Sequence, residues 1–173
     1  MTERGTPGIT IVVAMDQNRV IGREGDIPWR GRLRADMDHF KKYTMGKIVV
    51  MGRKTYDSIP PAFRPLVGRE NIVLTRNQSI DFPGCGKVSD PDSIERIAEA
   101  REICVIGGAE IYSLFLPVAK KMIVTHVGTR VQDGDTFFPE VDGDLWRFSK
   151  QLLVHDIDER NHFPFSISEY VRR

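Results

Sequence analysis

Cysteine is scarce in this chain of 173 residues, which contains only Cys85 and Cys104. Two thiols are too few for a disulfide framework or for a cysteine-based metal cluster. Cys104 lies in the apolar run of residues 103–106, where a free cysteine behaves as a small core side chain. The sequence therefore gives no sign of an oxidising compartment, and we expect no metal.

The chain also lacks an excess of charge and any long hydrophobic run. Its 25 Lys and Arg residues nearly balance 24 Asp and Glu residues, and a net charge of +1 argues against a broad surface for nucleic acid. No stretch approaches the roughly 18 apolar residues that cross a bilayer, and the N-terminus shows no signal-peptide pattern. We therefore expect a cytoplasmic protein without a membrane partner. Its length and 40% hydrophobic content suit one domain, residues 1–173.

Short β-branched runs alternate with helical patterns along most of the chain, which is typical of parallel strands joined by crossover helices. Strands are expected at residues 9–15, 48–51, 71–75, 103–106 and 122–127. Helices are expected at residues 33–43, 53–58, 90–100 and 109–115, and a polar loop at 16–32. Residues 151–158 and 165–170 alternate like antiparallel strands. The predicted fold class is α/β, a single-domain mixed, mainly parallel twisted sheet with helices on both faces and a C-terminal antiparallel strand pair.

Asp36 is the most informative residue, because it is a lone carboxylate on the apolar side of a predicted helix. Leu33, Met37 and Phe40 recur at the spacing of one helix face, and Asp36 falls within that stripe. A carboxylate that faces a core must be paired, hydrogen-bonded or protonated. Asp36 is therefore a candidate for proton chemistry or for binding a hydrogen-bond donor. The alternative is a structural bond to the backbone or to Arg32.

Three strand-to-helix junctions have the composition of a phosphate-binding site. Ligand phosphates bind at the carboxyl ends of strands in open α/β sheets, where helix N-termini present free amide donors. Cations, hydroxyls and glycines occupy these ends in residues 52–55, 75–76 and 107–110. The full Gly-x-Gly-x-x-Gly fingerprint is absent from them, so a standard dinucleotide-binding motif is not supported.

Motifs along almost the whole chain resemble those of dihydrofolate reductases. They are Ala14, residues 18–22, 27–29, 35–36, Phe40, residues 50–56, 64–66, 68–69, Asn71, and residues 105–112, 125–126 and 134–139. Each motif is moderately specific, whereas their order and spacing together are very specific. The resemblance implies the dihydrofolate reductase fold and reduction of dihydrofolate by NADPH, with hydride added at C6 and a proton at N5 of the pterin.

The resemblance also assigns roles to individual residues. Asp36 matches the acid that bonds the pterin 2-amino group and N3, Thr125 the hydroxyl that holds this acid, and Tyr112 a neighbour of the nicotinamide. With Trp29 they form the expected catalytic set, and water is the expected carrier of the proton. The implied substrate-binding residues are Val12, Ala14, Asp36, Met37, Phe40, Ile59, Arg64, Leu66, Arg69, Ile106 and Thr125, with Ile27 and Trp29 from the loop.

Arg69 matches the arginine that binds the α-carboxylate of the substrate's glutamate tail, and its planar fork suits a bidentate bond. Arg64 and Lys41 are weaker candidates for the outer part of the tail. Arg53, Lys54, Thr75 and Arg76 match groups around the 2′-phosphate of NADPH. The implied cofactor-binding residues are Ala14, Ile21, Gly22, Gly52, Arg53, Lys54, Thr55, Leu74, Thr75, Arg76, Ile106, Gly107, Gly108, Ala109, Glu110, Ile111, Tyr112 and Thr136.

Some features depart from the family pattern. Tyr56 stands where many relatives carry tryptophan, and residues 30–32 and 60–63 lengthen two loops. The loop at 16–32 is expected to close over the cofactor, and His126 is expected to pack or hydrogen-bond structurally. We expect a monomer that binds antifolate inhibitors. The alternatives are a related NADPH-dependent reductase of a ribosylated pyrimidine and a non-catalytic nucleotide-binding module.

Overall fold

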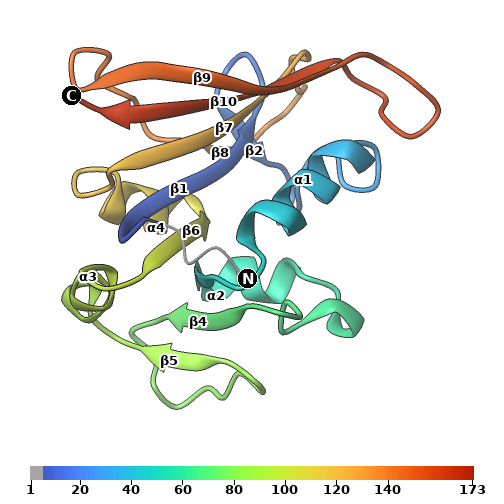
Figure 1. Ribbon diagram of the computed structural model, residues 1–173. Coiled ribbons are helices and arrows are strands. Elements are labelled where there is room, and N and C mark those ends of the chain that lie inside the picture. Colours follow the sequence, from blue (N-terminus) through green and yellow to red (C-terminus); the bar gives the residue numbers. More distant parts are fainter. Residues whose placement is uncertain (1–5) are drawn as a thin grey trace. The chain divides into compact units, whose positions relative to one another are not determined.

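The structure, a computed structural model, describes residues 6–173. Its secondary-structure elements belong to two compact units (Figure 1). The first unit contains the residues up to Ile11 and the segment Thr44–Ala119, and the second contains Val12–Tyr43 and Lys120–Arg173. Strand β1 (Gly8–Met15) runs from the first unit into the second.

A parallel sheet with the strand order β5-β4-β3-β6-β1 organises the first unit. β3 pairs in parallel with β4 and with β6, β4 pairs with β5, and β6 pairs with residues 8–11 of β1. The strands are β3 (Ile48–Gly52), β4 (Glu70–Leu74), β5 (Gly86–Val88) and β6 (Glu102–Gly107). The expected parallel strands are confirmed, and β5, which has only three residues, was missed.

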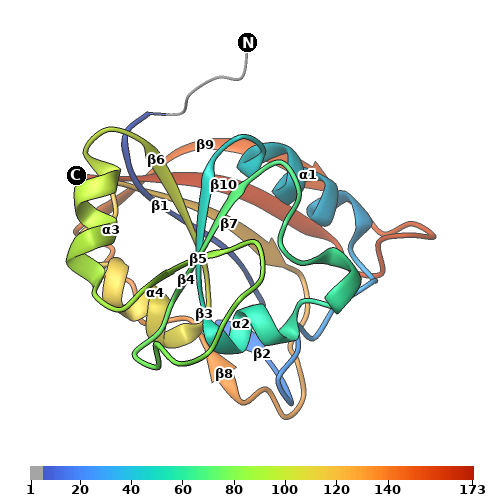
Figure 2. The same cartoon turned by 90° about the horizontal axis from the view of Figure 1, so that it is seen from below.

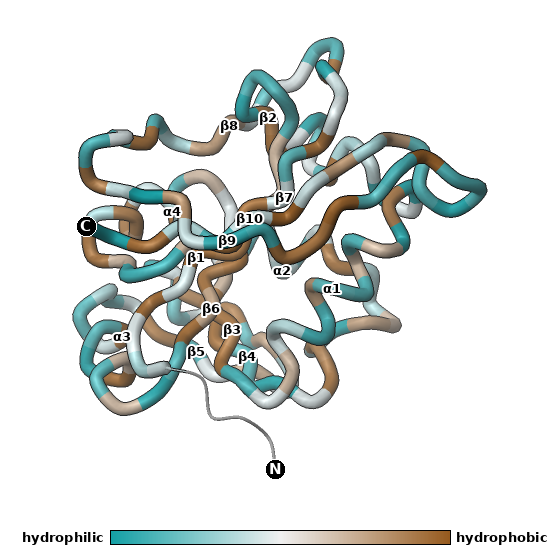
Figure 3. The backbone as a smooth tube through the Cα atoms, turned by 45° about the horizontal axis from the view of Figure 1, so that its top comes forward, coloured by the Kyte–Doolittle hydropathy of each residue, from teal (hydrophilic) through white to brown (hydrophobic). Residues whose placement is uncertain are grey.

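Burial on both faces explains the continuous apolar runs of β3 and β6. Ile48, Val49, Val50 and Met51 are each 0% exposed, and Cys104 in β6 is as fully buried as predicted. Figure 2 shows α3 and α4 on one side of these strands and α2 on the other. The hydropathy colours of Figure 3 place strongly hydrophobic segments in β3 and β6. Strands covered by helices on both faces lose the polar alternation of a half-exposed sheet.

Proline and N-capping residues explain where helices of the first unit begin and end. α2 (Arg53–Ser58) ends just before Pro60, which cannot continue a helix, and the 3-10 helix η1 (Pro61–Phe63) follows. α3 (Pro91–Ala98) is N-capped by Asp90, whose side chain accepts a 2.8 Å hydrogen bond from the Ser93 amide. α4 (Ala109–Phe115) follows β6 directly. The predicted helices at 53–58, 90–100 and 109–115 are thus confirmed within about two residues at each end.

Antiparallel pairing dominates the second unit. β10 (Phe165–Arg172) pairs antiparallel with β7 (Lys121–Val127) and with β9 (Trp146–His155). The expected C-terminal antiparallel pair is confirmed, but β9 starts earlier than residue 151. Its first half carries the polar sequence Arg147 to Lys150 around an exposed Phe148, a pattern that resembles a loop.

The segment 16–32, predicted as a loop, contains a short strand. β2 (Val20–Gly22) pairs antiparallel with β8 (Thr136–Phe137) to form a separate two-stranded sheet. Three residues are too few to show a period of two, and the pairing partner is remote in sequence. The loop prediction was therefore wrong for β2.

A buried carboxylate fixes the start of this segment. Asp16 is 4% exposed, and its side chain accepts hydrogen bonds of 2.7–2.8 Å from the backbone amides of Asn18, Val20 and Val131. The Asn18 and Val20 bonds hold the turn at residues 16–20, and the Val131 bond joins Asp16 to the chain before β8. No helix among residues 6–173 is long and apolar enough to cross a membrane.

Candidate active site

Helix α1 (Arg34–Thr44) carries Asp36, and a remote segment holds its first turn. The Asn161 side chain accepts a 2.8 Å hydrogen bond from the Ala35 amide, and the Arg160 carbonyl accepts a 3.1 Å bond from the Arg34 amide. These acceptors satisfy two of the free N–H groups at the helix start. Asn161 is itself 3% exposed and bonded to Asp158, so Asp36 is placed by an ordered support.

Asp36 is half-buried, and Thr125 of β7 donates a 2.6 Å hydrogen bond to its Oδ1. Burial raises the pKa of the Asp36 carboxyl, because desolvation disfavours the charged form, and the Thr125 hydrogen bond opposes part of that rise. Among residues 6–173, Thr125 is the hydrogen-bond partner of this carboxylate, and Oδ2 has none. The expected contact between Thr125 and the acid is confirmed, and the alternative bond to Arg32 is absent from the described residues.

The apolar stripe around Asp36 is only partly buried. Leu33 is 4% exposed and Trp29 is 4% exposed, but Met37 is 47% exposed and Phe40 is half-buried. Met37, which the resemblance assigns to substrate binding, thus has open surface. Ala14 is the one half-open position in the otherwise buried strand β1. Apolar side chains with open surface beside a carboxylate offer a face for a flat, hydrogen-bonding ligand.

The three phosphate-type junctions lie together in the first unit because their strands are paired in register. Gly52 at the end of β3 pairs with Leu74 at the end of β4, and Met51 pairs with Gly107 of β6. Parallel strands place their carboxyl ends at one sheet edge, so residues 52–55, 75–76 and 107–110 gather there.

Backbone exposure at this edge depends on glycine. Gly107 has φ +125°, and a Cβ there would lie 3.3 Å from the Tyr112 hydroxyl and 3.4 Å from Thr55 Oγ1. A Cβ on Gly52 would lie 2.9 Å from Ile111 Cγ1. Tyr112 is 4% exposed, and burial raises the pKa of its hydroxyl far above the ordinary tyrosine range, so the ring is neutral. The edge thus presents bare backbone and a hydroxyl, groups that suit a dinucleotide, next to the buried neutral ring of Tyr112.

The cations of the edge differ in how freely they can bind an anion. Arg53 lies 3.8 Å from Asp57 one helical turn away, whereas Lys54 and Arg76 make no ion pair with the described residues. All three side chains are on exposed residues. Lys54 and Arg76 are therefore the cations most available to a phosphate, with Thr75 directly before Arg76.

Arg69 is a half-buried guanidinium without an anionic partner among residues 6–173. Its Nε donates to the Val67 carbonyl at 3.0 Å, and its Nη1 donates to Thr44 Oγ1 at 3.2 Å. Partial burial lowers its pKa, although guanidinium stays charged at neutral pH. The alternative for Arg69 is a surface pair with Glu70 or Asp57, but among the described residues Glu70 pairs with Arg101, and Asp57 with Arg53 and Arg64. The free face of its fork suits a carboxylate.

Arg64 is already engaged within the first unit. Its guanidinium lies over the Tyr56 ring, 4.6 Å from the centroid, and donates to the Tyr56 carbonyl at 3.0 Å. Tyr56 also contacts Phe82 edge to face. These contacts give Arg64 a structural role in addition to its predicted binding role.

The other expected site residues fall into both units. Gly22 and Thr136 are paired in the small sheet, and a Cβ on Gly22 would lie 3.1 Å from Thr136 Cβ. His126 hydrogen-bonds Tyr170 at 2.9 Å, which confirms its structural assignment. The second unit also holds Val12 and Ile21, and the first holds Ile59, Leu66, Ile106, Ala109 and Glu110.

Sequence reasoning missed Asn161 and Asp16. Ala35 and Asn161 are 126 residues apart, so no local pattern predicts their bond. One indirect signal existed: residues 30–33 contain no Ser, Thr, Asp or Asn to cap α1, which means that a cap must come from elsewhere.

The family model described as dihydrofolate reductase matches residues 8–172. The dihydrofolate reductase of Bacillus subtilis is 38% identical over 168 residues, which cover 95% of each chain. That of Mycobacterium tuberculosis is 41% identical over 153 residues, 84% of this chain and 92% of the relative. A solved dihydrofolate reductase from Enterococcus faecalis, complexed with NADP(H) and RAB-propyl, matches with a TM-score of 0.88 and 28% identity over 97% of this chain and 98% of its own.

The raised pKa of Asp36 predicts how stability depends on pH. The folded protein holds this proton more tightly than the unfolded chain, so the Asp36 contribution to the free energy of unfolding falls as pH rises from about 4 to neutrality. Asp36→Asn removes the buried charge and keeps an oxygen for Thr125. We expect the variant to gain stability relative to the wild type as pH rises through this window, measured by urea denaturation.

The control is Asp38→Asn, which removes an exposed carboxylate that lies 3.1 Å from Arg34 on the same helix. A surface pair of this kind contributes little, so the change should stay below about 0.5 kcal/mol. If Asp36→Asn lost stability relative to the wild type as pH rose, the assignment of a raised pKa would be wrong.

Proposed function

The chain belongs to the dihydrofolate reductase family, and on that premise we propose that it reduces 7,8-dihydrofolate to 5,6,7,8-tetrahydrofolate. The reaction consumes one NADPH and one proton and releases NADP⁺. NADPH supplies the hydride for C6, and a solvent proton carried by water reaches N5. The observation that carries the proposal is the Asp36 carboxylate, which Thr125 holds by one oxygen while the other bonds no group of residues 6–173.

Asp36 binds and orients the pterin in this proposal. Its carboxylate accepts hydrogen bonds from the 2-amino group and N3, and the Thr125 bond keeps the side chain from rotating away. The negative charge lies close to the ring and favours the N5-protonated form, so that the carboxylate acts electrostatically without delivering the proton itself. Trp29, Val12, Ala14, Met37 and Phe40 supply apolar surface from the same unit.

The first unit binds NADPH in this proposal. Gly107 and Gly108 let backbone amides approach the pyrophosphate at the start of α4, and Gly52, Thr55, Ile106, Ala109, Glu110 and Ile111 adjoin them. Tyr112 lies beside the nicotinamide. Thr75, Arg76 and Lys54 bind the 2′-phosphate, assisted by Arg53, and Leu74 contacts the adenosine. Ala14, Ile21, Gly22 and Thr136 are further cofactor-binding residues in this proposal, and the segment 16–32 is a mobile loop of the catalytic cycle.

Broader features of the protein belong to the same proposal. It acts as one domain in the cytoplasm and as a monomer, without nucleic acid or membrane partners. Its product serves one-carbon metabolism, and antifolates that present an amino-substituted ring to Asp36 inhibit it. Ile59, Leu66 and Arg64 contact the aminobenzoyl part of the substrate, and Lys41 lies near the outer tail.

Mixing the purified protein with NADPH and dihydrofolate tests the activity directly. Consumption of both, followed by the fall in absorbance, supports the proposal. Turnover of a ribosylated pyrimidine from riboflavin synthesis without turnover of dihydrofolate would instead favour the related reductase. NADPH binding without turnover of either would favour the non-catalytic module.

The Asp36→Asn variant tests the central residue by kinetics. The change preserves shape but places an amide donor opposite the donors of the pterin and removes the charge that favours N5 protonation. Turnover at neutral pH should fall by at least about 10²-fold, while the Kd for NADPH stays near the wild-type value. Lower pH should restore part of the rate. Asp38→Asn on the same helix should turn over normally, and normal turnover by Asp36→Asn would contradict the catalytic role.

Arg76→Ala tests the assignment of the 2′-phosphate site. Loss of one charge-assisted contact, worth about 1.5 to 3 kcal/mol, should raise the KM for NADPH by at least about tenfold. The KM for NADH should change little. Arg147→Ala, which removes an exposed cation from β9, is the control and should leave both values unchanged. An equal loss with both cofactors would show that Arg76 does not distinguish them.

Arg69→Lys tests the glutamate-tail site. The charge is retained but the planar fork is lost, so the bidentate bond cannot form. We expect the Kd for dihydrofolate to rise by about tenfold, while a pterin without the glutamate binds nearly as before. The comparison needs calorimetric titration with both ligands. Equal weakening of the two would place Arg69 outside the tail site.

A further inference from the structure

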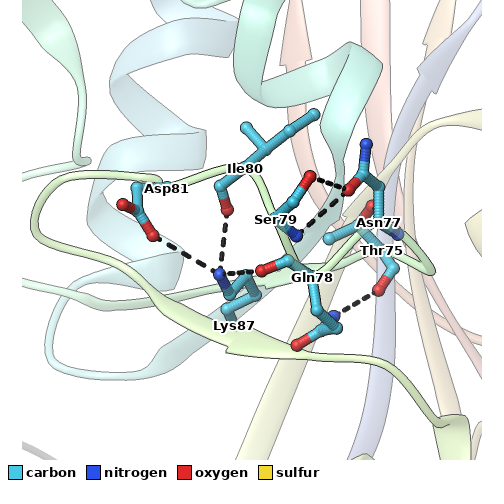
Figure 4. Close-up of polar contacts among 7 residues, drawn as sticks. All are labelled: Thr75, Asn77, Gln78, Ser79, Ile80, Asp81 and Lys87. Carbon is cyan, nitrogen blue, oxygen red and sulfur yellow. Dashed lines mark hydrogen bonds and ion pairs between the residues drawn. The ribbon is translucent and has the colours of Figure 1, made fainter.

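Lys87 of β5 organises the loop that leaves β4 and returns to β5 (Figure 4). Its Nζ lies 2.6 Å from the Gln78 carbonyl, 3.0 Å from the Ile80 carbonyl and 3.4 Å from Asp81 Oδ1. An ammonium group has three N–H donors, so all of them have acceptors within this one loop. The Lys87 side chain is 24% exposed, whereas that of Asp81 is 96% exposed.

The hydrogen bonds continue from Lys87 to Thr75. Gln78, whose carbonyl binds Lys87, donates from its own Nε2 to the Thr75 carbonyl at 2.6 Å. The Thr75 amide donates to the Val88 carbonyl at 2.9 Å, and Thr75 Oγ1 accepts a 3.1 Å bond from the Asn77 amide. Both backbone polar groups of Thr75 are therefore held by residues of the same loop and strand.

This arrangement leaves two groups free to bind an anion. The Thr75 hydroxyl oxygen accepts a bond from Asn77, but its proton has no acceptor among residues 6–173. The next residue, Arg76, is exposed and makes no ion pair with the described residues. The bonds to the Thr75 backbone restrict the conformations of Thr75 and of the adjoining Arg76 backbone, which lowers the entropy that binding must overcome.

We propose that Lys87, acting through Gln78, is a positioning residue that sets the preference for NADPH over NADH. It holds Thr75 and Arg76 where they meet the 2′-phosphate and does not contact the cofactor itself. The inference rests on the proposed function and adds to it a residue outside the binding set. The two carbonyl bonds carry the effect, because the ion pair with the exposed Asp81 is worth little.

Lys87→Met is the main variant, because it keeps the length of the side chain and removes the donors. The KM for NADPH should rise about five- to tenfold, the equivalent of about one hydrogen bond, while kcat and the KM for NADH stay within about twofold. Binding without turnover gives a second readout. The Kd for adenosine 2′,5′-bisphosphate should weaken by the same factor, and that for adenosine 5′-monophosphate should not.

Three further variants locate the effect. Gln78→Ala should reproduce the loss, and the double variant should lose little more, because both residues belong to one chain of bonds. Asp81→Asn keeps an acceptor oxygen and should behave as wild type. Lys150→Met removes an exposed lysine from β9 and should also behave as wild type.

The proposal is overturned if Lys87→Met binds both nucleotides as the wild type does, or weakens both equally. Should Lys87→Met not fold, Gln78→Ala decides by the same two criteria. Failure of the proposed function looks different, since the wild type itself would then show no preference for NADPH or no turnover of dihydrofolate.

Discussion

The hydrogen bond between Thr125 and Asp36 is the interaction on which the proposed chemistry depends. It joins a buried strand to a half-buried carboxylate whose pKa is raised by burial. It fixes one carboxylate oxygen, while the other has no hydrogen-bond partner in the described part of the chain. Desolvation makes the charge costly, and the hydroxyl recovers part of that cost without neutralising it. The Asn161 cap supports this interaction by fixing the start of α1, because a shifted helix start would move the carboxylate away from Thr125. A stable protein could do without such a buried charge, so its presence points to function.

In the proposed function, the first unit binds NADPH through the geometry of its backbone more than through charge. The register of strand pairing brings the ends of β3, β4 and β6 together. Gly52 and Gly107 keep side chains away from the backbone that the cofactor approaches. An exposed ion pair such as Arg53 with Asp57 contributes about 0–1 kcal/mol, whereas a charge-assisted contact to phosphate contributes about 1.5 to 3 kcal/mol. Cofactor preference is therefore expected to follow Lys54 and Arg76, which pair with no carboxylate of residues 6–173, and the loop that adjoins Arg76.

The parts that the sequence predicts are those with a local pattern. Adjacent residues predict the apolar strands β3 and β6, and Asp90 and Pro91 predict the start of α3. The apolar stripe on α1 singles out Asp36. The same stripe does not predict the open surface of Met37, since helical spacing cannot tell a core-facing side chain from one with open surface. The pairing of β2 with β8, the Asn161 cap and the Asp16 bonds join segments that are remote in sequence, so no periodicity reveals them. Lys87 lies in the missed strand β5, and its acceptors in residues 78–81 follow no periodic pattern either.

Titration of the Asp36 carboxyl carbon by NMR, in the wild type and in Thr125→Val, measures the central interaction directly. We predict a wild-type Asp36 pKa above the ordinary aspartate range, because burial outweighs the hydrogen bond. The Asp36 pKa should be higher still in Thr125→Val, because the donor that stabilises the carboxylate is gone. The Thr125→Val protein should also bind a diamino-substituted pteridine more weakly, as the side chain is no longer held. An ordinary pKa in the wild type, or one unchanged by the loss of the hydroxyl, would contradict the account.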